Sequence, residues 1–331
     1  MSDPVNVRYL TGFESSNVVL LVGRQRVTLV TDYRYAEAAR SLDDFEVVEG
    51  ERVLPAWLGP RLGDFGKGPL AFEADALTVS AHAGLSADGV ELVPTERVVV
   101  ELRAVKEPGE LDAIRRAAEL AHTAYEALHD HGLVGHTERE VAWFLERTMR
   151  DAGAEGASFD PIIGSGANGA VPHHHPGERR VEPNELVVVD AGAKLDGYCS
   201  DCTRTFATGA LPDDLARAYE VCLEAQVRAL DAVHAGVSTR SVHELAHGVI
   251  EAAGQPHLQH GVGHGVGLDI HEAPVLRKDS EGDLVAGNVV TIEPGIYLAG
   301  RGGVRIEDLV IVTDEGADVL TPFTKDLLTL D

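Results

Sequence analysis

The sequence predicts an α+β protein with two domains, of which the first is a smaller α/β domain. The chain has 331 residues, which is long for a single hydrophobic core. Adjacent Pro and Gly residues at 108–109 indicate a boundary near residues 106–109, so we expect domains at residues 1–105 and 106–331. In the second domain, two helical patterns precede strand-like segments, and this order occurs twice. The repeat indicates two α+β halves that are related by pattern.

In the first domain, strand-like and helix-like patterns alternate. Residues 17–22 and 27–31 are rich in β-branched side chains and are joined by a short turn, which predicts two strands. Residues 35–40 then predict a helix. Few side chains here suit catalysis, so we expect the chemistry in the second domain.

The helices of the second domain are indicated by apolar spacing and by end signals. From Leu111 to Leu128, apolar residues recur at steps of three and four, which is typical of one face of a long helix. A second helix should begin at Thr137, where Glu140 completes a capping box, and should end near Gly153. The corresponding helices and the strands are expected at residues 215–234 and 242–253, and at 159–205, 289–293, 304–307 and 309–312.

The composition is that of a globular protein with a strongly acidic surface. With 28 Lys and Arg against 54 Asp and Glu, the net charge is −26. This charge repels nucleic acid and anionic membranes, so we expect neither as a partner. The three cysteines do not suggest a disulfide framework, and the first residues lack the basic and apolar regions of a signal peptide. We therefore expect a cytoplasmic protein.

A glycine-rich segment at residues 164–169 fits the dinucleotide-binding fingerprint by its letters alone. That fingerprint needs a helix directly after it, with its N-terminus facing a pyrophosphate. Here Pro172 and three histidines follow, and no helical period appears. A loop beside a functional site is the better interpretation.

Two aspartates are expected to converge in a hairpin. Asp190 ends an apolar run, where a buried carboxylate needs a partner, and Asp201 lies eleven residues later. A turn centred between Leu195 and Asp196 would place the two aspartates opposite each other on one face. Two close carboxylates repel unless a cation lies between them. Two exposed acids in a hairpin are the alternative interpretation.

His264 lies in a segment with glycines at alternate positions, flanked by His260 and His271. The glycines suit an extended backbone beside a bulky or charged group. Three histidines in twelve residues are candidate metal ligands or proton carriers, although single histidines are often structural.

Glu293 and Glu307 each follow β-branched residues, where glutamate is normally avoided. Together with the two aspartates and one histidine, they make a donor set that suits two divalent ions. Oxygen-rich sets with one imidazole favour Mn²⁺, with Co²⁺ or Zn²⁺ as alternatives. Two such ions can activate a water molecule and stabilise a tetrahedral intermediate.

These blocks resemble the pita-bread metallopeptidases, the group of aminopeptidase P, prolidase, methionine aminopeptidase and creatinase. The resemblance covers nearly the whole chain. It includes residues 9–13 and 31–35 in the first domain and residues 189–192, 200–205, 263–265, 292–295 and 305–308 in the second. It implies a C-terminal pita-bread domain of two pseudo-related halves, a creatinase-like N-terminal domain, and a homodimer.

The resemblance also implies residue roles. The metal ligands would be Asp190, Asp201, His264, Glu293 and Glu307, with Asp201 and Glu307 bridging both ions and Glu293 also accepting a proton from the bridging water. His173 and His271 would act at the substrate side, and His260 would line a proline pocket. Tyr297 and Arg305 would support the metal-binding carboxylates. We expect His174 and His175 to face solvent.

The implied reaction is hydrolysis of the bond before a proline by a metal-bridging hydroxide. Short prolidases often carry an arginine directly after a His-Glu-x-Pro block, where it can hold the free carboxylate of a dipeptide. Val275 takes that position here, which favours an Xaa-Pro aminopeptidase. Arg277 lies two residues on and would point to the same side, so a strict Xaa-Pro dipeptidase is the alternative. A methionine aminopeptidase and a metal-free creatinase-like protein are less favoured.

Overall fold

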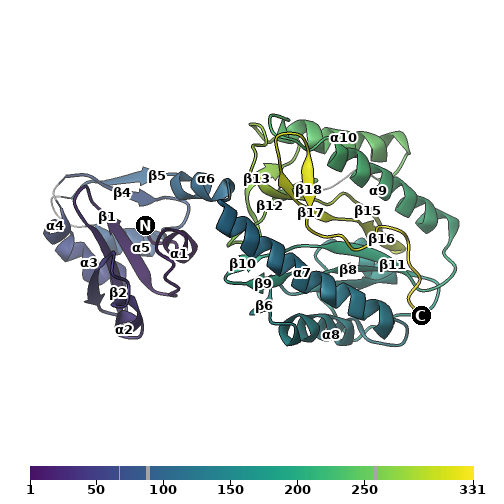
Figure 1. Cartoon of the computed structure of the whole chain (residues 1–331), viewed down its shortest axis with the longest axis horizontal. Helices are drawn as coiled ribbons and strands as arrows, with labels where there is room; N and C mark the ends of the chain where they lie inside the picture. Colours follow the sequence, from purple (N-terminus) through teal and green to yellow (C-terminus); the bar gives the residue numbers. More distant parts are fainter. Residues whose placement is uncertain (67, 87–89, 257–259) are drawn as a thin grey trace. The chain divides into compact units, whose positions relative to one another are not determined.

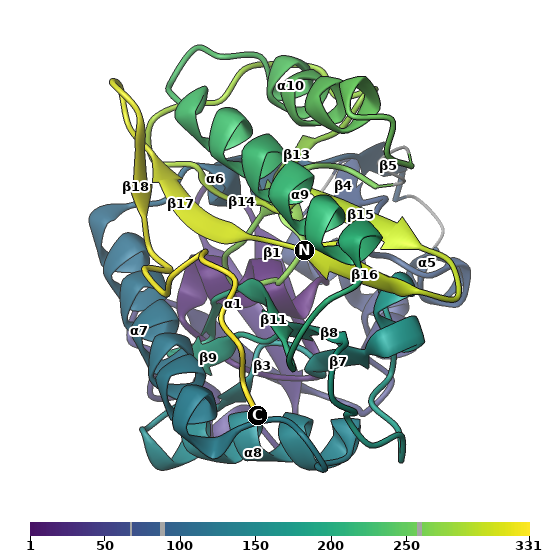
Figure 2. The same cartoon turned by 90° about the vertical axis from the view of Figure 1, so that its right-hand side faces the viewer.

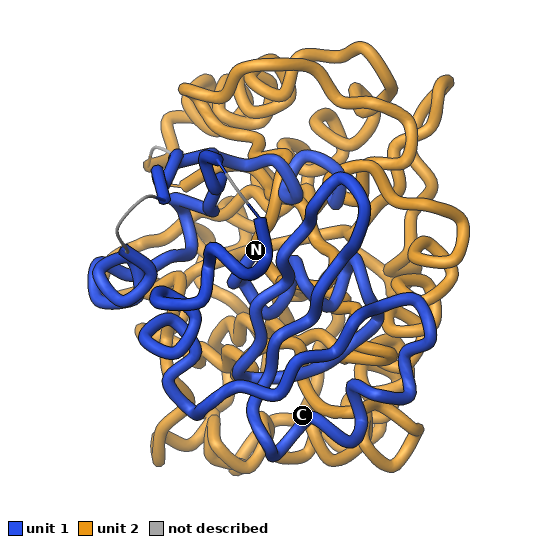
Figure 3. The backbone as a smooth tube through the Cα atoms, turned by 90° about the vertical axis from the view of Figure 1, so that its left-hand side faces the viewer, with its two compact units in different colours: residues 1–103 blue, residues 104–331 orange. Residues whose placement is uncertain are grey.

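The chain forms two units, residues 1–103 and residues 104–331, which Figure 3 shows in blue and orange. The structure is a computed structural model. Among the residues it describes, no helix has the length and apolar character needed to cross a bilayer. The described residues are 1–66, 68–86, 90–256 and 260–331.

The first unit is built around a three-stranded sheet with order β1-β2-β3. β1 and β2 form the predicted antiparallel pair, and β3 joins β2 in parallel. Because side chains alternate along a strand, Leu20 and Leu29 pack with Val7, whereas Val19 and Val30 pack with helix α3. The elements of this unit are α1 (Pro4–Thr11), β1 (Val18–Val22), β2 (Val27–Asp32), α2 (Ala36–Ala39), β3 (Glu46–Gly50), α3 (Leu54–Leu58), η1 (Gly59–Arg61), α4 (Leu62–Phe65), β4 (Leu70–Glu73), α5 (Val79–Leu85), β5 (Leu92–Thr95) and α6 (Val98–Ala104).

The helices of the second unit begin and end close to the predicted residues. At the start of the second helix, the Thr137 hydroxyl accepts a hydrogen bond from the Glu140 backbone, and the Glu140 carboxylate accepts one from the Thr137 backbone. This is the predicted capping box, and it satisfies two backbone N–H groups that lack helical partners. The helices are α7 (Pro108–His131), α8 (Glu138–Asp151), α9 (Asp213–Asp231) and α10 (Thr239–Ala252).

Each half of this unit combines two helices with antiparallel strands. Helices α7 and α8 pack with the sheet of order β11-β8-β7, and α9 and α10 pack with the five-stranded sheet β13-β12-β14-β17-β18. In Figures 1 and 2 the strands of the unit lie between these two helix pairs. The remaining elements are β6 (Gly156–Ala157), β7 (Ile162–Ser165), η2 (Gly166–Ala170), β8 (Leu186–Asp190), β9 (Ala193–Leu195), β10 (Tyr198–Cys199), β11 (Thr203–Ala207), β12 (Gly263–Gly265), β13 (Glu272–Leu276), β14 (Val289–Ile292), β15 (Gly295–Leu298), β16 (Gly302–Arg305), β17 (Asp308–Val312) and β18 (Ala317–Val319).

The predicted pairing of Asp190 with Asp201 is wrong. The turn is centred on Asp196 and Gly197, which both have positive φ, so Asp190 pairs with Thr203 instead. A tight hairpin turn with positive φ at both central residues favours Asp-Gly over Leu-Asp. Moving the turn centre by one residue changes each pairing by two residues. A shift of two keeps every side chain on its face of the sheet, so the two aspartates still approach each other.

Candidate active site

A cavity of about 440 Å³ lies in the second unit, within the size range of small-molecule sites. All five predicted metal ligands line it. Of the other predicted site residues, five also line it, and Tyr297 is joined to two of those by hydrogen bonds. The five ligands are Asp190, Asp201, His264, Glu293 and Glu307, and the other lining residues predicted for the site are His173, His260, His271, Arg277 and Arg305.

The ligand candidates lie at the ends of strands from both halves. Asp190 is the last residue of β8, and Asp201 lies between β10 and β11 in the first half. In the second half, Glu293 directly follows β14 and Glu307 lies between β16 and β17. The strands beside these carboxylates are buried, so they carry the carboxylates into the interior of the unit.

His264 is the central residue of β12, and the glycines around it are required by neighbouring backbone. A Cβ atom on Gly263 would lie 1.9 Å from the Thr291 carbonyl oxygen, and one on Gly265 would lie 2.2 Å from that of Ala273. Both positions therefore exclude any side chain. The glycines allow β13 and β14 to approach β12 closely. The groups next to these glycines are therefore backbone carbonyls, and not the bulky or charged group that the sequence predicted.

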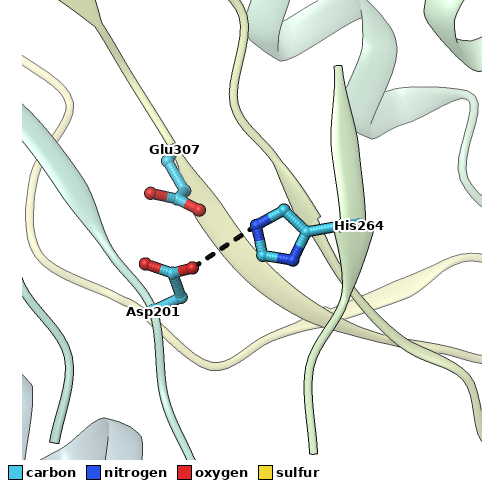
Figure 4. A group of neighbouring side chains, drawn as sticks. All are labelled: Asp201, His264 and Glu307. Carbon is cyan, nitrogen blue, oxygen red and sulfur yellow. Dashed lines mark ion pairs between the residues drawn. The ribbon is translucent and has the colours of Figure 1, made fainter. Parts of the chain in front are cut away.

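Three of the candidates converge closely (Figure 4). Asp201, His264 and Glu307 each offer a ligand atom, and these atoms lie within 4.8 Å of one another, a group that can hold a metal ion. His264 Nε2 lies 3.6 Å from Asp201 Oδ2 and 3.3 Å from Glu293 Oε1. The His264 Nδ1 atom lies 3.1 Å from the Gly265 carbonyl oxygen, which orients Nε2 toward the carboxylates.

Burial and mutual repulsion raise the pKa values of the carboxyl groups. For Asp201, burial contributes most, followed by the charges of Glu307 and Asp190, and the pKa lies well above its ordinary value. The pKa of Glu307 is raised well above its usual range by burial and then by Glu293 and Asp190. Burial also raises the pKa of Glu293 and lowers that of His264. Such a cluster requires added positive charge to hold its acids ionised.

Two oxygen atoms of this cluster lack partners. Asp190 Oδ1 and Glu307 Oε1 are buried without a hydrogen-bond partner among the described residues. An unpaired buried carboxylate oxygen is costly, so each such atom needs an explanation. Together with the convergent imidazole, they fit divalent cations.

Arg305 holds Asp190 from behind. Its Nη2 donates to Asp190 Oδ2 over 2.7 Å, and its Nε donates to the Thr203 hydroxyl over 3.0 Å. The Thr203 hydroxyl has one proton, which it donates to Glu307 Oε2 over 2.7 Å. Thr203 was not predicted as a site residue. A correct hairpin register would have placed Thr203 opposite Asp190 and so indicated it as a site residue.

The hydrogen bonds of Tyr297 fix the ring of His260. Arg305 Nη1 can only donate, so it donates to the Tyr297 hydroxyl oxygen over 3.0 Å. The Tyr297 proton is then donated to His260 Nε2, over 3.0 Å, because burial raises the pKa of the phenol to about 12. His260 must therefore carry its own proton on Nδ1, which donates to the Gly261 carbonyl oxygen over 2.7 Å. Both ring nitrogens are used, and the ring offers carbon atoms to the cavity.

The two histidines that were predicted to act on the substrate line the cavity. His173 and His271 are both exposed, and the His271 ring meets the His264 ring edge-on at 4.4 Å between centroids. His175 is exposed, as predicted. The prediction for His174 is wrong, because only 18% of its side chain is exposed and its Nε2 lies 2.8 Å from Glu138 Oε2. No local pattern indicates this contact, since the two residues lie far apart in the sequence.

A buried charged network behind Glu307 was also not predicted. Arg204 is almost fully buried, donates to Asp308 Oδ1 over 2.9 Å and to the Glu307 carbonyl oxygen, and reaches carbonyl groups of residues 321–324. Asp308 also accepts hydrogen bonds from Gln226 and Lys325. This network fixes the backbone that carries Glu307.

Replacing Arg204 by Met should lower the free energy of unfolding by about 3–5 kcal/mol, because Asp308 loses a buried partner. Urea unfolding of metal-free protein measures the change. The matched control is Arg301→Met, which breaks the exposed pair with Asp214 and should cost under about 1 kcal/mol. Equal losses for the two variants would show that the network adds nothing beyond a surface pair.

The chain matches two family models that together cover most of its length. The model of the Creatinase/Prolidase N-terminal domain matches residues 1–105. The model of metallopeptidase family M24 matches residues 112–314, more than half of the chain. The chain belongs to metallopeptidase family M24. The α+β prediction is confirmed, with an M24 pita-bread domain preceded by a creatinase-like domain.

Relatives of this M24 chain are similar over almost their whole length. A Xaa-Pro dipeptidase of Pyrococcus horikoshii is 32% identical over 98% of this chain and 92% of that protein. The structure of a Xaa-Pro dipeptidase from Bacillus anthracis matches with a TM-score of 0.93 and 38% identity, over 98% of this chain and 92% of that one. The X-Pro aminopeptidase of Thermotoga maritima MSB8 matches with a TM-score of 0.89 and 32% identity, over 99% and 94%.

Proposed function

We propose that this M24 peptidase hydrolyses the bond between a first residue and a following proline, with Xaa-Pro dipeptides as its substrates. The names of the Pyrococcus and Bacillus relatives support the dipeptidase activity. The observation that carries it in this chain is Arg277, a cation on the wall of the same cavity as the ligand candidates.

The five ligand candidates would hold two divalent ions, with Mn²⁺ expected first and Co²⁺ or Zn²⁺ as alternatives. Asp201 and Glu307 would bridge the ions, because their carboxylates converge with His264, and burial and neighbouring carboxylates raise the pKa of both well above the ordinary value. The ions would supply positive charge that activates water and polarises the substrate carbonyl. Glu293, beside His264, would accept a proton from the attacking water.

The remaining site residues would act on the substrate. His173 and His271 lie at the exposed side of the cavity and would hydrogen-bond the substrate carbonyl and the tetrahedral intermediate. His260 would contact the proline ring, and its carbon surface suits an apolar pyrrolidine because both ring nitrogens are already bonded. Arg305 and Tyr297 would hold Asp190 and His260 in place.

Arg277 would hold the free carboxylate of a dipeptide. Val275 and Arg277 both line the cavity, so the valine does not exclude a cation on that wall. The Arg277 side chain is 57% exposed, and its Nε lies 2.8 Å from Asp279 Oδ1. An exposed pair of this kind contributes little, so a substrate carboxylate can replace Asp279 at small cost.

The second candidate function is an Xaa-Pro aminopeptidase that acts on longer peptides. Val275, in place of the arginine that short prolidases often carry, favours it, and so does the name of the Thermotoga relative. We retain the homodimer and the cytoplasmic location as predictions.

We expect Ala-Pro to be cleaved much faster than Ala-Pro-Ala, Ala-Ala or Met-Ala by the metal-loaded enzyme. Arg277→Ala should raise the KM for Ala-Pro by roughly 10- to 100-fold, the value of a charged hydrogen bond of about 1.5–3 kcal/mol. Lys278→Ala, an exposed cation on the next residue, is the matched control and should leave KM unchanged. The aminopeptidase activity would be assigned instead if the wild type cleaves Ala-Pro-Ala fast and Arg277→Ala leaves the KM for Ala-Pro unchanged. Equal turnover of Met-Ala and Ala-Pro would exclude the proline specificity.

A further inference from the structure

Glu138, the first residue of α8, has a fully buried carboxylate that accepts five hydrogen bonds. Its Oε1 accepts from the Ser165 backbone at 2.9 Å, the Ser165 hydroxyl at 2.7 Å and Asn168 Nδ2 at 2.9 Å. Its Oε2 accepts from His174 Nε2 at 2.8 Å and from the Gly177 backbone at 3.2 Å. This is far more than a capping acid at a helix start requires.

The carboxylate is held in its charged form. Burial raises the pKa of Glu138, but the hydrogen bonds from Ser165, Asn168 and His174 outweigh burial, and the pKa lies below its ordinary value. A charged carboxylate only accepts, so His174 Nε2 must carry a proton and donate it. The position of the His174 ring is therefore fixed by Glu138.

These hydrogen bonds hold the segment that carries His173. The donors lie at the end of β7, in η2 and in residues 174–177, on both sides of His173. The Pro172 carbonyl oxygen, directly before His173, accepts from Arg305 Nη1 over 3.1 Å. His173 thus lies between Pro172, which is held by Arg305, and His174, which is held by Glu138. Arg305 also binds Asp190.

We propose that Glu138, acting through His174, is a positioning residue that fixes His173 at the substrate side of the cavity. The carboxylate is buried and accepts hydrogen bonds from the backbone at both ends of the segment, at Ser165 and at Gly177. This inference rests on the proposed function of His173. A displacement of a substrate-contacting group by about 1 Å can lower the rate about 100-fold. Contacts that hold the exposed His173 in place therefore affect the rate directly.

The test is a double-mutant cycle on Ala-Pro hydrolysis. Glu138→Gln places an amide N–H₂ where an oxygen accepts from His174 or Gly177, and kcat/KM should fall about 10- to 100-fold. In a His173→Ala background the same change should have no further effect, because Glu138 acts through His173. Bound metal, measured by elemental analysis, should stay at the wild-type level. Multiplicative losses in the double variant would overturn the positioning role.

A second variant and a second measurement guard against a folding defect. His174→Ala leaves Glu138 and its four other hydrogen bonds, and should reproduce the loss in kcat/KM. Amide hydrogen exchange in residues 168–177 should become faster in both variants. Asp151→Asn, an exposed acid at the far end of α8, should change neither property. Unchanged exchange in the Glu138→Gln and His174→Ala variants would refute the inference.

The two proposals fail in distinguishable ways. If His173→Ala retains full activity on Ala-Pro, the proposed function of His173 is wrong, and hydrogen exchange still decides whether Glu138 holds the segment. If His173→Ala loses activity but Glu138→Gln does not, the proposed function stands and the positioning role is wrong.

Discussion

Replacing Asp201 by Asn or Glu307 by Gln is expected to remove most bound metal and to lower kcat/KM by at least about 10³-fold. Each substitution removes a charge that both ions would share, and metal charge stabilisation amounts to several kcal/mol in the transition state. Elemental analysis and Ala-Pro hydrolysis measure the two effects. Asp214→Asn, an exposed acid paired with Arg301, is the control and should change neither.

The same substitution should have the opposite effect on stability in the metal-free protein. Glu307 is buried among carboxylates that repel it, so Glu307→Gln should raise the melting temperature in the presence of a chelator. Added Mn²⁺ should raise the melting temperature of the wild type more than that of the variant, by mass action. A full complement of metal in both Asp201→Asn and Glu307→Gln would refute the bridging roles.

His271→Ala is expected to lower kcat by about 10²- to 10⁴-fold while metal content stays normal. The exposed ring lies beside His264 on the cavity wall, and loss of an acid–base group or hydrogen-bond donor has effects of this size. The control is His129→Ala, an exposed histidine on α7 outside the cavity. A variant of His271 that keeps its activity but loses metal would assign the residue to metal binding.

Local signals predicted the elements well because they depend on neighbours in the sequence. The capping box at Thr137 and Glu140 needs only a four-residue window, and α8 begins where it predicts. The hairpin turn was placed one residue early, since a turn of this type depends on positive φ at Asp196 and Gly197. The sequence still predicted that Asp190 and Asp201 converge. The predicted pairing was wrong by two residues, and a shift of two leaves both side chains on the same face of the sheet.

Long-range contacts were beyond the reach of these signals. Glu138 looks like an ordinary acid in the first turn of a helix, and its burial depends on Ser165, Asn168 and His174 from a later segment. Arg204 and Asp308 lie in strand-like sequences that give no sign of a fully buried ion pair. Such partners are set by how the sheets and helices pack, which single-sequence periodicity does not encode.

The ligand candidates come from both halves of the second unit, and this affects how fast the protein is degraded in the cell. Without ions, like charges meet where the halves join, so opening the structure there should cost less free energy than in the metal-loaded protein. Molecules that have failed to acquire metal would expose this region more often to cellular proteases than loaded molecules do. Metal supply would then set the abundance of the enzyme as well as its activity.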